Sequence, residues 1–365
     1  MQVERGMGVE SAAIVALSIP FALGVAAAAA TSKVIGGYGY LAASLCMAAV
    51  AGLMVLCCSQ GNRRTGIYAL YAILGYLCWL GSALCGTPSA ALPQFTGAWL
   101  DRLSGLIDET GFSDGRTTAL LKALLTGRKG GLEQSTLQAF RVSGASHILA
   151  LSGLHLGIIY SCIATCLKIL GNSRPAAIVR STVTVTACGL YTLITGAGPS
   201  TVRAFLFIIF TEISRLQPGR RRSPLAILCT ALMIQLCIAP NVISSVGFQL
   251  SYLAMLGIFV IFPSLDGWYP SDAGWDPMKR IWTSIALTVS CQIFTAPVVW
   301  MHFHTFPKYF LLTNLLALPV TEALMVSAVL TLTLSALGCC PETAKALVDF
   351  LAGALIFCLD VISGM

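Results

Sequence analysis

The sequence predicts an all-α integral membrane protein, a polytopic bundle of roughly ten to eleven transmembrane helices with short amphipathic surface helices. Of its 365 residues, 56% are hydrophobic and only 10% are charged, whereas soluble domains carry about 25% charged residues. The mean hydropathy is +0.83, and segments of about 20 apolar residues recur along the whole length. These segments, such as 11–30, are apolar on every face, unlike the alternating strands of a membrane β-barrel. A water-soluble enzyme is therefore excluded.

The spanning helices follow from hydrophobicity, and their ends follow from proline and glycine, which interrupt or begin helices. Gly198-Pro199, for example, opens a short span, and Cys340-Pro341 precedes the last one. In chain order, the predicted spans are 11–30, 40–58, 66–86, 146–170, 176–195, 200–214, 223–239, 242–262, 281–300, 309–337 and 344–363.

The basic residues predict a cytoplasmic N-terminus, because cytoplasmic loops are enriched in Lys and Arg. With that orientation, the short outside loops hold only Lys33 and Lys308. The inside segments hold Arg5, Arg63, Arg64, Lys168, Arg174, Arg180, Arg215, Arg220, Arg221, Arg222, Lys279, Arg280 and Lys345.

Three regions follow from this pattern: N-terminal transmembrane helices (1–86), an extracytoplasmic amphipathic segment (87–145) and a transmembrane core (146–365). In the middle region, acidic and basic residues nearly balance. Leucines such as Leu120 and Leu124 recur at helical spacing, which predicts two or three amphipathic helices. These helices either lie on the outer membrane surface or pack as a cap over the bundle.

Polar residues gather where the fourth predicted span begins, in SGASHILALSGLHLG (143–157). His147, Ser152 and His155 must each find a partner or line a wet cavity at membrane depth. On an unbroken helix the two histidines would differ by about 80° in direction and about 12 Å in height. They therefore cannot share a metal ion unless Ser152-Gly153 interrupts the helix.

Two alternative chemistries remain open for the histidines. Ser152 and His155, three residues apart, could form a nucleophile and base, but no carboxylate lies nearby in the sequence to orient the base. His302 and His304, just after the ninth span, could converge with His147 on a metal ion. A lone histidine at a membrane interface is more often a hydrogen-bonded capping group. The expectation is a chain with no cofactor, no resident metal and no catalysis of its own.

An arginine follows a predicted helix break in GAGPSTVRA (196–204). Gly198 and Pro199 interrupt the chain, and Arg203 comes within one turn of the next apolar helix. An arginine there either extends to the membrane interface or faces water and a polyanion inside the bundle. Glu212 lies nine residues on, about 180° around the helix, so the two cannot pair along one straight helix.

Two later spans also carry polar groups, Gln249 and Tyr252 in one and Asn314 with Pro319 in the other. Polar side chains and a proline inside spans are typical of a water-lined pathway or a broken helix. Hydrogen bonds between helices are the alternative explanation. We predict helix breaks at Gly153, Gly198, Pro199 and Pro319.

Taken in order, these motifs resemble the competence domain of the ComEC family, the DNA-internalisation channel of naturally transformable bacteria. The matching segments are GRKGGLEQSTLQAFRVSGASHILALSGLHLG (127–157), GAGPSTVRA, FQLSYLAMLGI (248–258) and the run from Pro297 to Pro319. The resemblance covers about 127–320 and makes 146–365 a competence-type channel core. It implies a channel in the bacterial cytoplasmic membrane that passes single-stranded DNA inward during natural transformation, after the other strand is degraded.

The resemblance also implies partners: single-stranded DNA, membrane lipid, a DNA receptor, and a cytoplasmic ATPase or single-strand-binding protein. A homo-oligomer stays open, since a pore could form within one chain or between two. A strand's path needs cations for phosphates and aromatic faces for bases. Arg203 is the expected phosphate contact and Tyr252 a stacking face. His147, Ser152 and His155 would line the outer mouth, and Gln249 and Asn314 would lie along the path.

The chain also departs from longer family members, which carry an OB-fold insertion and a metallo-β-lactamase-like domain. The stretch 87–126 is too short and too helical for an OB barrel, and no HxHxDH-type metal motif occurs. Nuclease activity is therefore not expected, and the stop at Met365 leaves open that the chain is a truncated or split product. Two other functions stay open: a transporter of a different solute or polymer, and an intramembrane metal or serine hydrolase.

Overall fold

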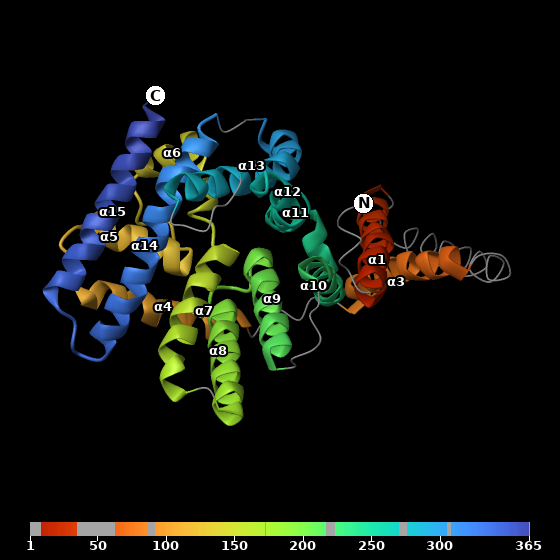
Figure 1. Ribbon diagram of the computed structural model, residues 1–365, viewed down its shortest axis with the longest axis horizontal. Coiled ribbons are helices and arrows are strands. Elements are labelled where there is room, and N and C mark those ends of the chain that lie inside the picture. The colour runs from red at the N-terminus through yellow and green to blue at the C-terminus, as the bar shows by residue number, and fades with distance from the viewer. Residues whose placement is uncertain are drawn as a thin grey trace. The chain divides into compact units, whose positions relative to one another are not determined.

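The structure is a computed structural model that describes residues 9–34, 63–85, 92–171, 173–216, 223–269, 276–304 and 308–364. All regular elements in these ranges are helices, as Figure 1 shows, which confirms the predicted all-α class for the described residues. The predicted span 40–58 lies outside them.

Among the helices of the described ranges, seven are long and apolar enough to cross a membrane, and two apolar helices of 15 residues are shorter. The structure thus supports a membrane protein with several spans, and the count of ten to eleven spans stays a prediction. The seven candidate spans are Glu10–Ser32, Arg64–Ala83, Gly153–Leu170, Arg174–Ile194, Pro277–Phe303, Phe310–Ala336 and Glu342–Ser363.

One predicted span, α9 (Pro199–Leu216), is not among the seven because its 18 residues include three charges, Arg203, Glu212 and Arg215. The first two of these side chains are buried. Charged residues that are buried in a membrane protein mark functional or strongly constrained positions.

The chain forms two compact units. Unit 1 comprises 1–89 and 213–260, and its described helices are α1 (Val9–Val34), α3 (Arg63–Cys85), α10 (Pro224–Ile238), the 3-10 helix η4 (Pro240–Ser244) and α11 (Val246–Val260).

Glycines set the packing of α1 on α3 in unit 1. The Cα of Gly24 faces the carbonyl of Ala72, and the Cα of Gly75 faces the carbonyl of Phe21, with no room for a Cβ at either glycine. Small residues let membrane helices approach this closely. In the same unit, the predicted single span 242–262 is replaced by η4 and α11.

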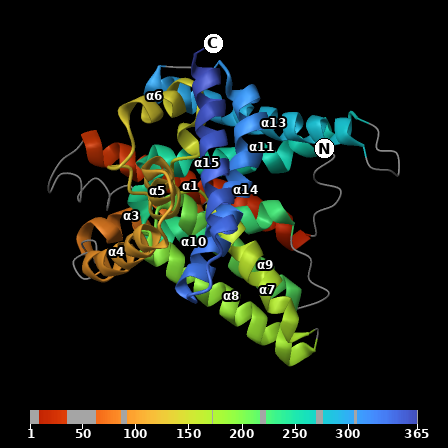
Figure 2. The same ribbon diagram turned by 90° about the vertical axis from the view of Figure 1, so that its left-hand side faces the viewer.

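Unit 2 comprises 90–212 and 261–365. In chain order it holds α4 (Leu92–Thr110), α5 (Gly115–Thr126), α6 (Gln134–Val142), η2 (Ala145–His147), α7 (Gly153–Cys166), η3 (Leu167–Leu170), α8 (Arg174–Ile194), α9 as far as Glu212, α12 (Phe262–Asp266), α13 (Pro277–Phe303), α14 (Phe310–Ala336) and α15 (Glu342–Ser363). α7 lies beside α8, and α14 beside α15 (Figures 1 and 2).

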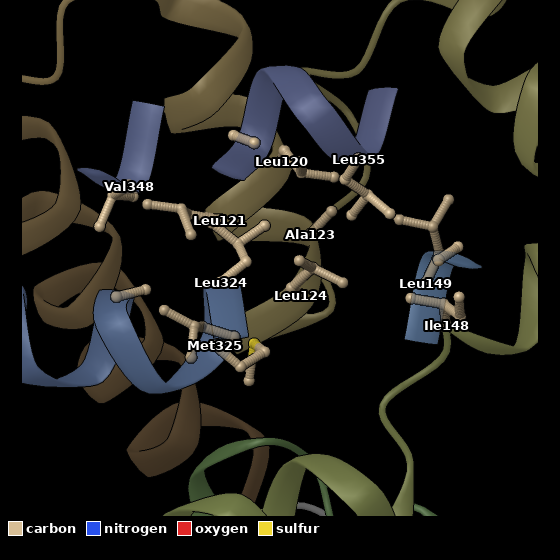
Figure 3. Packing of buried hydrophobic residues seen from close by; sticks show 14 of the residues in the cluster. Leu120, Leu121, Ala123, Leu124, Ile148, Leu149, Leu324, Met325, Val348 and Leu355 are labelled. Atoms are coloured by element: carbon tan, nitrogen blue, oxygen red, sulfur yellow. The ribbon is translucent and has the colours of Figure 1, made fainter. Parts of the chain in front are cut away.

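The short helices α4 to α6 pack into the main core of unit 2. Leu120, Leu121 and Leu124 of α5 are fully buried against α14 and α15, as Figure 3 shows for Met325 and Leu355. The apolar face of this segment is therefore packed into the protein core. It is not available to lie on the membrane surface. The three functional regions predicted from sequence do not coincide with the two compact units and stay a prediction.

Two helix boundaries differ from prediction. The span predicted over 146–170 begins only at Gly153, because the chain before it forms η2 and then a non-helical stretch. α14 continues through Pro319, so the predicted break there is wrong. Proline removes one backbone hydrogen bond, and membrane helices tolerate this where neighbouring groups satisfy the freed carbonyl.

The glycine contact in unit 1 gives a stability prediction. Gly75→Ala should lower the free energy of unfolding by about 1–3 kcal/mol, because the new methyl group overlaps the Phe21 carbonyl. Gly81→Ala, in the same helix, should be neutral or stabilising, since nothing lies within 4 Å of its Cβ position. Thermal unfolding in detergent compares the two variants. Equal unfolding temperatures would contradict the packing of α1 on α3.

Candidate functional site

The first turn of α7 is built by a reciprocal cap. Ser152 is the N-cap residue, and its Oγ accepts a hydrogen bond from the backbone N–H of Leu154 at 3.2 Å. The backbone N–H of Ser152 donates to Nδ1 of His155 at 3.1 Å. This is the capping-box arrangement with histidine in place of Glu or Gln. It explains why the helix begins at Gly153 and not earlier.

The backbone fixes opposite tautomers in the two histidines. Nδ1 of His155 accepts a hydrogen bond from an amide, so the neutral ring carries its hydrogen on Nε2. Nδ1 of His147 contacts the carbonyl of Gly144 at 3.0 Å and must donate to it, which leaves the lone pair on Nε2. The two rings are close enough to interact electrostatically.

The side chain of His147 is exposed at the end of η2. Desolvation lowers the pKa of its imidazole, and the hydrogen bond to the Gly144 carbonyl acts in the opposite direction.

Arg203 packs against the same end of α7 from the first turn of α9. A Cβ at Gly153 would lie 3.0 Å from Nη2 of Arg203 and 3.1 Å from Cβ of Ala204, so a larger residue would crowd this contact. The arginine is 8% exposed and has further interactions within the protein. The side chain of Arg203 is therefore buried inside the protein and does not extend to the membrane interface.

The turn between α8 and α9 places Arg203. Gly196 and Ala197 have positive φ angles of 86° and 48°, and α9 begins at Pro199, whose fixed φ suits a first helical position. The carbonyl of Gly198 accepts hydrogen bonds from Oγ1 of Thr201 at 2.8 Å and from the N–H of Val202 at 2.9 Å.

At its other end, α9 buries Glu212 between two neighbouring helices. Its carboxylate accepts hydrogen bonds from the hydroxyl of Tyr160 on α7 and from Oγ of Ser181 on α8, the latter at 2.6 Å. From the sequence, Glu212 could not pair with Arg203 along one straight helix, and no other partner could be named for it. Three separate helices contribute to this contact, so no local sequence pattern signals it.

The remaining predicted path residues lie in both units. In unit 1, the hydroxyl of Tyr252 donates to Oε1 of Gln235 at 2.9 Å and its ring packs against Phe248, with centroids 4.7 Å apart. Nε2 of Gln249 donates to the carbonyl of Ile243 at 3.0 Å. These contacts are internal packing, and a stacking role for Tyr252 stays a prediction. Asn314 lies in unit 2, at the start of α14.

The histidines after the ninth span are placed at the end of α13. His302 and His304 are exposed, and Nδ1 of His302 hydrogen-bonds the carbonyl of Val298 at 3.0 Å. Within the described ranges, no group of three or more His, Cys, Asp or Glu side chains could hold a metal ion. Ser152 Oγ lies 3.5 Å from Nδ1 of His155, but that nitrogen already accepts from an amide.

The Glu212 contact predicts a stability difference between two tyrosines. Tyr160→Phe should destabilise unit 2 by about 1–3 kcal/mol, because it removes a donor from a buried carboxylate. Tyr68→Phe, at an exposed tyrosine of α3, serves as the matched control and should have little effect. Thermal unfolding in detergent measures both. If the two variants unfold at the same temperature, the Tyr160 hydroxyl does not support Glu212.

Comparison with known proteins places this arrangement in a family. Residues 124–365 match the family model described as "Competence protein". ComE operon protein 3 of Bacillus subtilis (strain 168) is 29% identical over 204 residues, which are 56% of this chain and 24% of that protein. The chain thus spans about a quarter of that relative's length. No solved structure matches the chain significantly. The chain belongs to the competence protein family, and its C-terminal two thirds form a competence domain of the ComEC type.

Proposed function

We propose that this chain takes part in DNA uptake during natural transformation and that it passes one DNA strand across the bacterial cytoplasmic membrane. The observation that carries the proposal is the placement of Arg203 inside a competence domain. A cation is buried at the point where the N-terminal ends of two membrane helices meet, and helix N-termini and arginine both favour phosphate.

The physical argument is electrostatic. A strand that enters an apolar bundle must keep its phosphates solvated or paired, because unpaired charges are costly at low dielectric. The guanidinium of Arg203 is a planar fork of five N–H donors, a geometry that matches the oxygens of a phosphate. His147 and Ser152 extend the polar wall at the same helix end, whereas His155 is buried on the opposite face of α7.

Initial DNA capture fits another protein better. In the segment formed by α4 to α6, three of the basic side chains pair with carboxylates of that same segment. These pairs are Arg116 with Glu133 at 3.1 Å, Lys122 with Asp108 at 2.7 Å, and Arg128 with Asp101 at 2.7 Å. A segment neutralised in this way attracts a polyanion weakly. The proposal therefore includes a separate DNA receptor outside the membrane and an ATPase or single-strand-binding protein in the cytoplasm. The N-terminus of the chain lies in the cytoplasm in this proposal.

Arg203→Ala tests the proposed phosphate contact. In a strain lacking the native gene and carrying residues 1–365, the variant should reduce marker transfer by about tenfold or more, since one charge-assisted contact is worth about 1.5–3 kcal/mol. Arg203→Lys should retain part of the activity. Arg141→Ala, at an exposed arginine of the same unit, is the control and should transfer markers normally. Normal transfer by Arg203→Ala at equal protein level would remove Arg203 from the mechanism.

Strand selectivity separates this proposal from a carrier of another solute. In proteoliposomes containing the purified chain, a labelled single strand should enter the lumen faster than a duplex of equal length, because only unpaired bases can contact the polar wall. A small neutral solute of similar label provides the leak control. Equal entry of strand and duplex, or entry of the solute alone, would favour the carrier function.

A further inference from the structure

The first turn of α7 has two opposite faces. Positions 153 and 155 differ by about 200° around a helix. Gly153 faces Arg203 and Ala204, and Leu156 and Tyr160 continue that face toward α8 and α9. His155 belongs to the other face, which continues through Ile158 and Cys162 into the main core of unit 2. His155 is only 1% exposed.

α14 presents the surface that meets the His155 face. Asn314, Ala317, Leu318 and Thr321 share one side of α14, because they are spaced by three or four residues. Ala317 and Leu318 belong to the same hydrophobic cluster as Ile158 and Cys162 of α7.

The neighbouring polar groups place both helix starts at the same end of the unit. Oγ1 of Thr313 donates to the carbonyl of Ser143, just before η2, at 2.7 Å. α14 also packs against η2, which ends at His147. His155 and Asn314 each lie within about one turn of the start of their own helix.

Each of these two residues has one buried atom without a hydrogen-bond partner. Nε2 of His155, which carries the hydrogen, is a donor without an acceptor. Oδ1 of Asn314 is an acceptor without a donor. An unsatisfied buried polar atom is costly, so such atoms usually mark a bound water or ligand. The Nε2–H donor of His155 and the Oδ1 acceptor of Asn314 would together suit a ligand that can both accept and donate hydrogen bonds.

We propose that His155 and Asn314 form a binding site for a neutral group that both donates and accepts hydrogen bonds. Water supplies that chemistry in the empty protein, and the edge of a nucleobase supplies it when a strand is present. The nucleobase part rests on the proposed function. α7 then separates two kinds of contact, with phosphate at Arg203 on one face and a neutral group on the other.

The chemistry of the site favours a neutral ligand over an ion. His155 is held as the neutral Nε2–H tautomer, and the Asn314 amide carries no charge. Two or more polar partners suffice to hold a water molecule, and asparagine amides bind base edges through the same atoms.

Hydrogen exchange at the histidine C2 position tests the site, because the chain has four histidines and His302 and His304 are exposed references. The full chain in lipid nanodiscs is incubated in deuterated buffer and analysed by mass spectrometry, with each rate followed to its alkaline plateau. A hydrated His155 should exchange within about tenfold of His302 despite its burial. A His155 that stays unexchanged long after His302 is complete would overturn the proposal.

A pair of variants connects that exchange to Asn314. Asn314→Leu removes the acceptor at similar volume and should slow His155 exchange by about tenfold or more, with His302 unchanged. Thr321→Val is the matched control, because this hydroxyl lies on the same side of α14 but already donates to the carbonyl of Ala317 at 2.7 Å. Equal His155 rates in the parent and Asn314→Leu would contradict a shared site.

Two strands distinguish the sources of the ligand. A short oligothymidylate and an abasic strand of equal length are added to the nanodiscs, and their binding is checked by fluorescence anisotropy. Protection of His155 by oligothymidylate alone supports the base-edge contact. Equal rates with both strands bound would overturn that contact and assign the site to water. If neither strand binds, the proposed function is contradicted. The exchange rate of His155 measured without DNA still tests whether the site exists.

Discussion

The buried carboxylate of Glu212 is the contact on which the arrangement of α7, α8 and α9 depends. Tyr160 and Ser181 donate to it from two different helices. A carboxylate in an apolar environment is stable only when such donors are in place, so the three helices are held in one relative position. Along α9, Arg203 then lies about 13 Å from Glu212. The contacts of Glu212 thereby fix where Arg203, at the other end of α9, meets α7.

The start of α7 is the second constraint, because it determines which chemistry each face of the helix receives. Capping by Ser152 and His155 begins the helix at Gly153, where the missing Cβ admits the guanidinium of Arg203. A helix starting at residue 146, as the hydrophobicity predicted, would bury the capping groups within the helix. The observed start leaves cationic chemistry toward α9 and neutral hydrogen-bonding chemistry toward α14.

Hydrophobicity and helix punctuation predicted the helical class and most of the apolar segments, because membrane insertion depends on those properties alone. They also singled out Arg203, since an arginine in an apolar helix is unusual at any position. The partners of Glu212 were not predictable, because they come from two other helices, 52 and 31 residues away in the sequence. Pro319 misled the prediction, since a proline weakens a helix by one hydrogen bond without always ending it. The packing of α5 depends on tertiary contacts that an amphipathic pattern leaves open.

The central claim is that a DNA strand passes the contact between α7 and Arg203. The most direct test places a photo-crosslinking amino acid at Leu154, an exposed position in the first turn of α7, in cells taking up labelled DNA. The account predicts crosslinks to one strand of the incoming DNA, and none from the same amino acid at Leu190, an exposed position of α8. Normal DNA entry without crosslinks at Leu154, or equal crosslinks at both positions, would contradict it.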